Sequence, residues 1–217
     1  MVQDYQNFIS ESAYIGNVKL KKNIYIGNNS SIGSPPNHID YFKKIELINK
    51  KFKSVILEDN VVVRDNCVIH CGVDQNTKIG KNSYIMSGSH IDHDCLIEND
   101  CTIAPNVHLA GNVHIKENSQ VGMGANIHQN IVVYEYAMVG MGATVVRDVP
   151  PFSVCIGTPG YAYKLNEVKL KRISLSKKLL EHIHDIVISN KPYASIKVSV
   201  KEKKYLDILR KWSKSGT

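Results

Sequence analysis

The chain has 217 residues, enough for one large domain or a domain with an appendage, and 43% of them are hydrophobic while 22% are charged. No apolar run reaches the roughly 18 residues that a membrane span needs, so the composition excludes insertion into a membrane. The first residues, Met1 to Gln6, include an acid and lead into no apolar segment, which indicates no secretory signal and favours a cytoplasmic protein.

The net charge of +7 is spread unevenly along the chain. Residues 161–217 carry 14 Lys and Arg against 5 Asp and Glu, whereas residues 1–160 carry 13 against 15. A basic segment suits nucleic acid, an anionic membrane or a phosphorylated small molecule, or is simply the solvated face of helices. No aromatic residues alternate with the basic ones as in nucleic-acid-binding motifs, so we expect no nucleic-acid partner.

An aliphatic residue recurs at every sixth position through much of the chain. Short stretches begin at Ile9, Ile26 and Leu57, and from Ile79 to Val145 all twelve successive sixth residues are Ile, Leu or Val. The residue four positions after each of these twelve is small or of modest size and uncharged. Helices repeat every 3.6 residues and strands every 2, so a period of six predicts a β solenoid with three flat faces and 18-residue coils.

Two segments interrupt this period. The first runs from about residue 34 to 54 and contains Asn37, His38 and Asp40, and the second, from Cys71 to Thr77, is shorter. An extra segment must leave the surface of a rigid coil, where it forms either a plain surface loop or a place for binding groups. We assign Asn37, His38 and Asp40 to substrate binding.

The sequence Gly-Thr-Pro-Gly at 157–160 predicts the end of the solenoid. We therefore divide the chain into a β-helix, residues 1–160 with an excursion near 34–54, and an α-helical C-terminal domain, residues 161–217. Apolar residues at helical spacing predict one helix from about Ser176 to before Pro192 and a second that includes Tyr205 and Trp212.

Coils of 18 residues would stack residue n on residue n+18, about 4.8 Å apart. His93 then lies beside Gly111, and His90 beside His108. The segment from His90 to Cys95 permits three interpretations: a metal site, a structural histidine cluster, or a general base at His93 with Asp94 as its orienting carboxylate. We favour the base, because an imidazole with a pKa near about 6.5 suits proton transfer at neutral pH.

Acyl transfer from a thioester also needs a donor for the developing oxyanion, and the backbone N–H of Gly111 can supply it. No competing nucleophile is evident, since the chain has no GxSxG sequence and Cys95 falls at a core position. The five cysteines are odd in number and have no CxxC spacing, so we expect reduced thiols and neither disulfides nor a zinc knuckle. The simplest mechanism is direct transfer without an acyl-enzyme.

Several segments together resemble the hexapeptide-repeat acyltransferases of left-handed parallel β-helix fold. They are Ser89–Cys95, Leu109–Gly111, Ile127–Gln129, Asp148–Pro151 and, in the tail, Lys164–Ser176. The branch to which they are most similar is the UDP-N-acetylglucosamine O-acyltransferases of lipid A biosynthesis. The expected fold is thus a left-handed parallel β-helix with a short α-helical C-terminal appendage.

The resemblance implies that His93 is the catalytic base, that Asp94 orients it, and that Gly111 supplies the oxyanion amide. It also implies a homotrimer with active sites at subunit boundaries. The residues that it places on the nucleotide sugar are His90, His128, Gln129 and, at the diphosphate, Arg172.

The chain departs from that branch at several contacts. Asn112 replaces the histidine expected after Gly111, Ile173 replaces a second arginine after Arg172, and the helical tail is shorter. We therefore favour related enzymes that transfer an acyl group from acyl-CoA, as co-substrate, to the amino group of a nucleotide-linked sugar. A dTDP-4-amino-4,6-dideoxyhexose is the best single acceptor, and we expect no metal.

Three alternatives remain open. The first is O-acylation of UDP-N-acetylglucosamine from acyl carrier protein, an acidic partner that would suit the basic tail. The second is a metal-dependent trimer similar to the γ-class carbonic anhydrases. The third is a non-catalytic scaffold, because solenoids also serve as binding surfaces.

Overall fold

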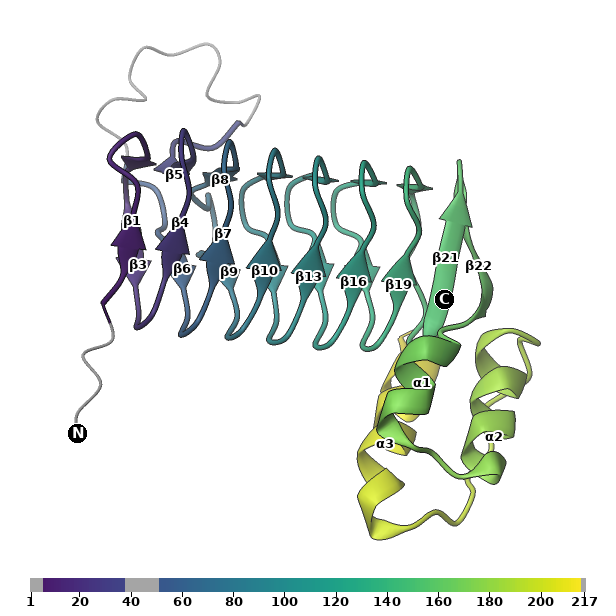
Figure 1. The fold of residues 1–217 in the computed structure, drawn as a ribbon. Coiled ribbons are helices and arrows are strands. Elements are labelled where there is room, and N and C mark those ends of the chain that lie inside the picture. The colour runs from purple at the N-terminus through teal and green to yellow at the C-terminus, as the bar shows by residue number, and fades with distance from the viewer. Residues whose placement is uncertain (1–5, 38–50, 216–217) are drawn as a thin grey trace, which may run out of the picture.

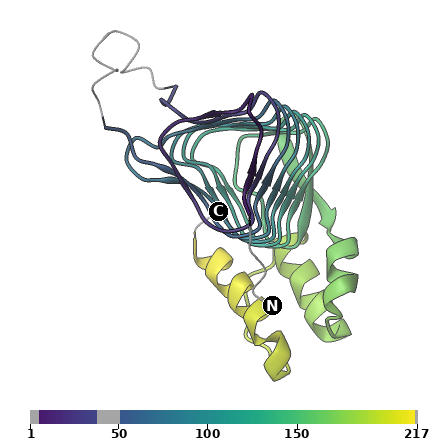
Figure 2. The same ribbon diagram turned by 60° about the vertical axis from the view of Figure 1, so that its left-hand side comes forward.

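A computed structural model describes residues 6–37 and 51–215, which form a parallel β-helix followed by helices (Figure 1). The predicted fold class, a β solenoid with an α-helical C-terminal appendage, is confirmed. Viewed closer to its axis, the β-helix has a three-sided cross-section (Figure 2). Most of the predicted excursion at 34–54, including His38 and Asp40, lies outside the described residues.

The described strands form three sheets, one on each side of the β-helix. The first sheet contains β1 (Phe8–Ile9), β4 (Tyr25–Ile26), β7 (Val62–Val63), β10 (Tyr84–Ile85), β13 (Thr102–Ile103), β16 (Gln120–Val121), β19 (Met138–Val139), β21 (Ser153–Gly157) and β22 (Gly160–Leu165). The second contains β2 (Tyr14–Ile15), β5 (Ser31–Ser34), β8 (Val68–His70), β11 (His90–Ile91), β14 (His108–Leu109), β17 (Asn126–Ile127) and β20 (Thr144–Val145). The third contains β3 (Val18–Leu20), β6 (Val55–Leu57), β9 (Thr77–Ile79), β12 (Leu96–Ile97), β15 (His114–Ile115) and β18 (Val132–Val133).

The residues that recur at every sixth position form the core of the β-helix. All twelve aliphatic residues from Ile79 to Val145 are buried, and so are the smaller residues four positions after each of them. From β9 to β20, the parallel pairs have the expected register of 18 residues, as in Tyr84 with Thr102. Aliphatic and small side chains therefore fill the narrow interior together.

The corners between strands explain why Asn, Asp or Gly recurs at the fourth position of the hexads. From Asn82 to Gly142, the fourth residue of nearly every hexad has a positive φ, and it is Asn, Asp or Gly in all these cases but one. These residue types tolerate the left-handed conformation best. Some of these side chains also bond along the corner, as when Asn60 donates to the Asn82 Oδ1 atom at 2.9 Å.

The two predicted interruptions change the register where they occur. Ser31 of β5 pairs with Val68 of β8, an offset of 37 residues that includes the first excursion. Val68 in turn pairs with His90 of β11, an offset of 22. The second interruption thus adds four residues to one coil, directly next to the strand that leads into His93.

The β-helix ends in an antiparallel hairpin. β21 and β22 pair from Ser153 with Leu165 to Gly157 with Gly160, so the sheet continues five residues past the boundary that the Gly-Thr-Pro-Gly turn suggested. The turn closes a hairpin because the chain reverses there and remains in the first sheet. The helices follow: α1 (Glu167–Ile173), α2 (Lys177–Val187), the 3-10 helix η3 (Val200–Glu202) and α3 (Lys203–Lys214).

The helices have a core of their own beneath the last coils (Figure 1). The helix predicted from about Ser176 is α2, and Ser176 caps it by accepting a hydrogen bond from the Leu179 N–H. Tyr205 of α3 packs edge-on against Tyr136 and Phe152 of the last coils, with ring centroids 5.6 and 6.2 Å away. None of the helices in residues 6–37 and 51–215 has the length and apolar character of a transmembrane segment.

Candidate active site

The His93 imidazole lies against the backbone of Gly111 on the next coil. A methyl group placed on Gly111 would lie 2.6 Å from His93 Nε2 and 2.5 Å from Cε1, well inside van der Waals contact. The ring thus occupies the space that the missing side chain leaves. The juxtaposition predicted from the 18-residue register is present.

Asp94 holds the other side of this imidazole. Its Oδ2 atom lies 2.7 Å from His93 Nδ1, and because a carboxylate only accepts, Nδ1 carries the proton and Nε2 is the basic nitrogen. The second oxygen, Oδ1, accepts hydrogen bonds from three consecutive backbone N–H groups, those of Val73, Asp74 and Gln75, at 2.8 to 3.0 Å. The side chain of Asp94 is 6% exposed, so these bonds fix a buried carboxylate.

The four-residue interruption before β9 is what supplies these three amides. It passes beside Asp94, and its Gln75 side chain also donates to the Asp94 carbonyl at 2.9 Å. A methyl group on Gly72, where the loop begins, would lie 2.9 Å from Asp94 Oδ1 and would overlap the Gln75 carbonyl oxygen. The loop therefore serves as a clamp on the carboxylate that orients His93.

The backbone N–H of Gly111 donates to no acceptor among the described residues. Its carbonyl, by contrast, accepts from the Asn130 N–H at 3.1 Å, so the peptide is held on one side and open on the other. The N–H of Met123, at the same hexad position, is similarly open. What distinguishes Gly111 is the imidazole beside it, because an open amide next to a base can stabilise an oxyanion.

A cavity of about 630 Å³ opens over this corner. Among the described residues, its lining includes the carboxylates of Asp74, Asp92 and Asp94 and no lysine or arginine. The described part of the lining is therefore acidic. The remaining lining residues are Asn37, Gln75, His93, Ala110, Gly111, Asn112, Gln129 and Asn130.

A second cavity of about 380 Å³ lies on the outer face of the second sheet and shares Asp92 with the first. His90 and His108 stack there with parallel rings 6.0 Å apart, and His128 lines the same surface. Burial lowers the pKa of His90, and the neighbouring His70 and His108 act in the same direction while Asp92 opposes them. The surroundings of the half-buried His90 thus favour its neutral form.

The predicted site residues divide into groups. His93, Asp94, Gly111, Asn37 and Gln129 line the first cavity, and His90 and His128 line the second. Arg172 lies on α1 in the helical appendage and lines neither cavity, while His38 and Asp40 lie outside the described residues. Asn112, one of the departures from the resembled branch, donates to the Asn130 Oδ1 atom at 2.7 Å and is therefore part of the corner.

The sequence reasoning did not single out His70. It is 6% exposed, and its Nε2 atom lies 3.2 Å from the amide nitrogen of Asn37. The sequence did contain a signal for its position, because His70 follows the aliphatic Ile69 as Asp92 follows Ile91, so both have the same place in their coils. The 22-residue register between these strands, and not 18, makes the two residues neighbours.

The cysteines are free and buried, in agreement with the predicted reduced thiols. Burial raises the pKa of Cys95 to about 12, and its thiol donates to the Ala110 carbonyl at 3.2 Å. A thiol of this kind is not a nucleophile at neutral pH. The described part of the site thus places His93 beside the Gly111 N–H, and Cys95 does not serve as a nucleophile there.

Comparisons with known proteins agree with the fold. The family model described as bacterial transferase hexapeptide (six repeats) matches residues 76–111, a range that contains His93, Asp94 and Gly111. No curated protein sequence matches the chain significantly.

Three solved structures illustrate the likeness. The UDP-N-acetylglucosamine acyltransferase from Campylobacter jejuni has a TM-score of 0.70 and 23% identity, over 94% of this chain and 92% of that one. The enzyme from Francisella novicida has a TM-score of 0.67 and 25% identity, over 94% and 83%. The Arabidopsis enzyme has a TM-score of 0.76 and 19% identity, over 98% and 90%. The predicted resemblance to hexapeptide-repeat acyltransferases is confirmed in repeat and fold.

Proposed function

We propose that the protein is a cytoplasmic acyltransferase that moves an acyl group from an acyl-CoA thioester to the amino group of a nucleotide-linked amino sugar. The observation that carries the proposal is the corner where His93 Nε2 faces Gly111 while Asp94 holds Nδ1 at 2.7 Å. A base whose basic nitrogen lies next to an open backbone N–H is the arrangement that direct attack on a thioester needs.

The reaction has two steps in this proposal. The acceptor nitrogen attacks the thioester carbonyl and forms the C–N bond while His93 Nε2 takes its proton, and the Gly111 N–H stabilises the resulting oxyanion. The tetrahedral intermediate then collapses, the C–S bond breaks, and the imidazolium returns the proton to the departing thiolate. Asp94 retains its charge throughout and stabilises the imidazolium.

The charge of the cavity supports an amine as the acceptor. Asp74, Asp92 and Asp94 line it, and no lysine or arginine does among the described residues, so these carboxylates would attract a protonated amino group before it loses its proton. Asn112 supports the same choice, because its side chain bonds to Asn130 where the O-acyltransferase branch is expected to have a histidine. A dTDP-4-amino-4,6-dideoxyhexose fits these requirements.

A second candidate is O-acylation of UDP-N-acetylglucosamine from acyl carrier protein. One specific observation favours it: the solved enzymes that match over nearly the whole chain, helical appendage included, are UDP-N-acetylglucosamine acyltransferases. The basic tail would then face an acidic carrier protein. Both candidates share His93, Asp94 and Gly111 and differ in acceptor and donor.

The proposal includes a homotrimer with sites at the subunit boundaries. Arg172 lines neither cavity of the single chain, so a contact between it and the sugar diphosphate would belong to a site completed by a neighbouring copy. His90, His128, Gln129 and Asn37 would contact the nucleotide sugar from the cavity walls. His38 and Asp40 remain predicted contacts as well.

The experiment is a substrate panel read by mass spectrometry. Purified protein is incubated with acetyl-CoA, longer acyl-CoA or acyl carrier protein thioesters, each against nucleotide sugars with a free amino group and against UDP-N-acetylglucosamine. We expect acylated amino sugar from the CoA donor and none with His93→Ala. Product only from UDP-N-acetylglucosamine and acyl carrier protein would establish the second candidate, and no product from any pair would overturn acyl transfer.

A further inference from the structure

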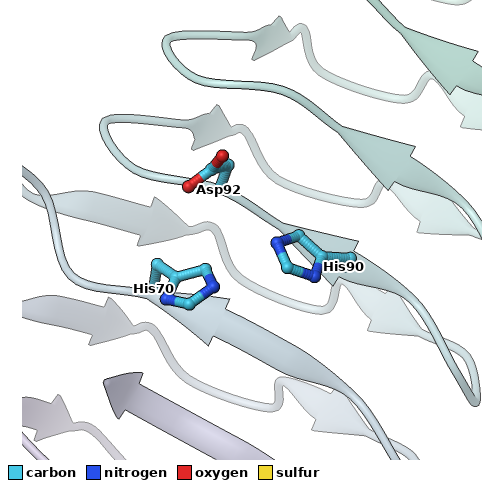
Figure 3. Close-up of side chains that lie close together, drawn as sticks. All are labelled: His70, His90 and Asp92. Atoms are coloured by element: carbon cyan, nitrogen blue, oxygen red, sulfur yellow. The ribbon is translucent and has the colours of Figure 1, made fainter. Parts of the chain in front are cut away.

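Two imidazoles and a carboxylate converge beside the catalytic corner. His70 of β8, His90 of β11 and Asp92 directly after β11 each have one potential ligand atom within 4.8 Å of those of the other two (Figure 3). The side chains come from neighbouring strands of the second sheet and point to the same side of it (Figure 3). Nothing in the acyl-transfer mechanism uses His70.

The geometry around His70 fixes its tautomer. Its Nδ1 atom lies 2.7 Å from the Pro35 carbonyl oxygen, which can only accept, so Nδ1 carries the proton. The Ser34 hydroxyl lies 3.0 Å from the same nitrogen. Nε2 therefore has the lone pair, and the Asn37 amide donates to it at 3.2 Å. A backbone carbonyl that holds the second nitrogen of an imidazole is a recurrent feature of histidines that bind metals.

Asp92 is also held in place. Its Oδ1 atom accepts a hydrogen bond from the backbone N–H of His93 at 2.8 Å, which orients the carboxylate at the corner. Asp92 lines both cavities, and no lysine or arginine lines them among the residues that the structure describes. The carboxylate of Asp92 would attract a cation placed between it and the two imidazoles.

We propose that His70, His90 and Asp92 form a binding site for a divalent transition-metal ion such as Zn²⁺. Two imidazole nitrogens and one carboxylate are a ligand set that Zn²⁺ accepts, with a fourth position left for water or another oxygen ligand. The fourth position would face the cavities, since Asp92 lines both and His90 lines the second. The Asn37 amide would leave Nε2 when the metal binds.

A histidine–carboxylate group on the third sheet, His114 and Glu98, lacks these features. Glu98 accepts from His114 Nε2 at 2.8 Å and also from Lys116 Nζ at 3.1 Å. A lysine in the group repels a cation and satisfies the carboxylate that would bind it. His114 is therefore the matched control for a metal-binding test.

The test uses tag-free protein, freed of metal by a chelator, and Co²⁺ as a spectroscopic probe. We expect one Co²⁺ per chain, with visible absorption from an asymmetric site, and displacement by Zn²⁺. Asp92→Asn retains an oxygen for the His93 N–H but removes the charged ligand, so we expect its Co²⁺ affinity to fall at least about 10-fold. His70→Gln should have the same effect, and His114→Gln should bind as the unaltered protein does.

The outcomes separate clearly. The proposal is overturned if the protein takes up no Co²⁺, if Asp92→Asn and His70→Gln bind it undiminished, or if His114→Gln weakens it equally. Thermal unfolding of each variant without metal shows whether it is folded, and Asp92→Asn serves if the buried His70→Gln is not. Because metal binding is measured and not turnover, this result is independent of the proposed acyl transfer.

Discussion

Two histidine–carboxylate pairs in the described part of the β-helix have almost the same distance between the ring nitrogen and the carboxylate oxygen. His93 is 2.7 Å from Asp94 at the corner after the second sheet, and His114 is 2.8 Å from Glu98 on the third. Their surroundings differ. The first pair lines a cavity beside an open backbone amide, whereas the second is completed by Lys116 at 3.1 Å.

The difference shows that the pair alone does not make a catalytic site. The second carboxylate oxygen of Asp94 accepts from three backbone amides of one loop, which leaves the first oxygen for His93, whose Nε2 stays directed at Gly111. Glu98 instead accepts from Lys116 as well as from His114, and the three side chains form a surface network. We therefore expect the first pair to control turnover and the second to control stability.

The largest effect is expected from His93→Ala. Without the base, turnover should fall at least about 10²-fold while the fold is retained, because proton transfer by a positioned side chain contributes on that scale. His114→Ala removes the histidine of the other pair and should leave turnover essentially unchanged. Steady-state kinetics of the two variants tests the contrast, and near-normal turnover of His93→Ala would refute the assignment.

Asp94→Asn should lower kcat on the order of 10²-fold by changing the imidazole tautomer. The three backbone N–H groups would hold the amide oxygen where Oδ1 is now, so the NH2 group must face His93 Nδ1. Nε2 would then carry the proton and could not accept one. Asn also tolerates the φ of 61° at this position, so the corner itself should survive. Unchanged kcat, with only KM raised, would contradict this role.

Gly111→Ala should reduce kcat between about 10- and 100-fold, since small displacements of a catalytic group have large effects. The new methyl group would lie 2.6 Å from His93 Nε2 and would push the ring away. The double variant with His93→Ala gives the control, because the methyl has no ring to displace there. If Gly111→Ala lowers kcat by the same factor in the His93→Ala background as in the parent, then displacement of the His93 ring is not the cause of the loss.

Much of the fold and the central pair of the site follow from the sequence. Twelve aliphatic residues at a strict spacing fix which side chains enter the core, and the resulting register places His93 beside Gly111. The sequence alone does not single out Asp94 as the residue that orients His93. Asp100 has the same left-handed backbone conformation at an equivalent corner, but no loop in the described part of the chain donates three backbone N–H groups to it. Only the path of the loop at 72–75 distinguishes the two.

The rest depends on register changes and packing that a period cannot reveal. His70 reaches Asp92 because four extra residues shift one coil from 18 to 22. The Gly-Thr-Pro-Gly turn connects β21 to β22 in a hairpin. The same sequence would also mark the end of the repeat if the chain left the sheet at that point, so it does not predict the hairpin. The short helix α1 contains one buried residue, Leu170, so its sequence has little apolar periodicity to detect.

The smallest effect is expected from Glu98→Gln, and it concerns stability. Burial raises the pKa of Glu98, but the hydrogen bond from His114 and the charge of Lys116 outweigh it and lower the pKa to about 2. A carboxylate whose pKa is lower in the folded state stabilises the fold above its usual pKa, and this contribution is lost as the pH falls from about 4.5 towards 2. Since the side chain is 36% exposed, solvent screening limits the contribution to about 1 kcal/mol.

Urea unfolding at fixed protein concentration therefore provides a pH-dependent test of the second pair. Glu98→Gln keeps an oxygen for His114 but loses the charge, so we expect it to be about 1 kcal/mol less stable than the parent at pH 7. The difference should shrink as the pH is lowered from about 4.5 towards 2, because the parent's carboxylate is then protonated too. Turnover at pH 7 should not change. A difference in stability that persists at low pH would mean that packing, and not charge, is what Glu98 contributes, and a loss of turnover would mean that the two pairs are not separate in function.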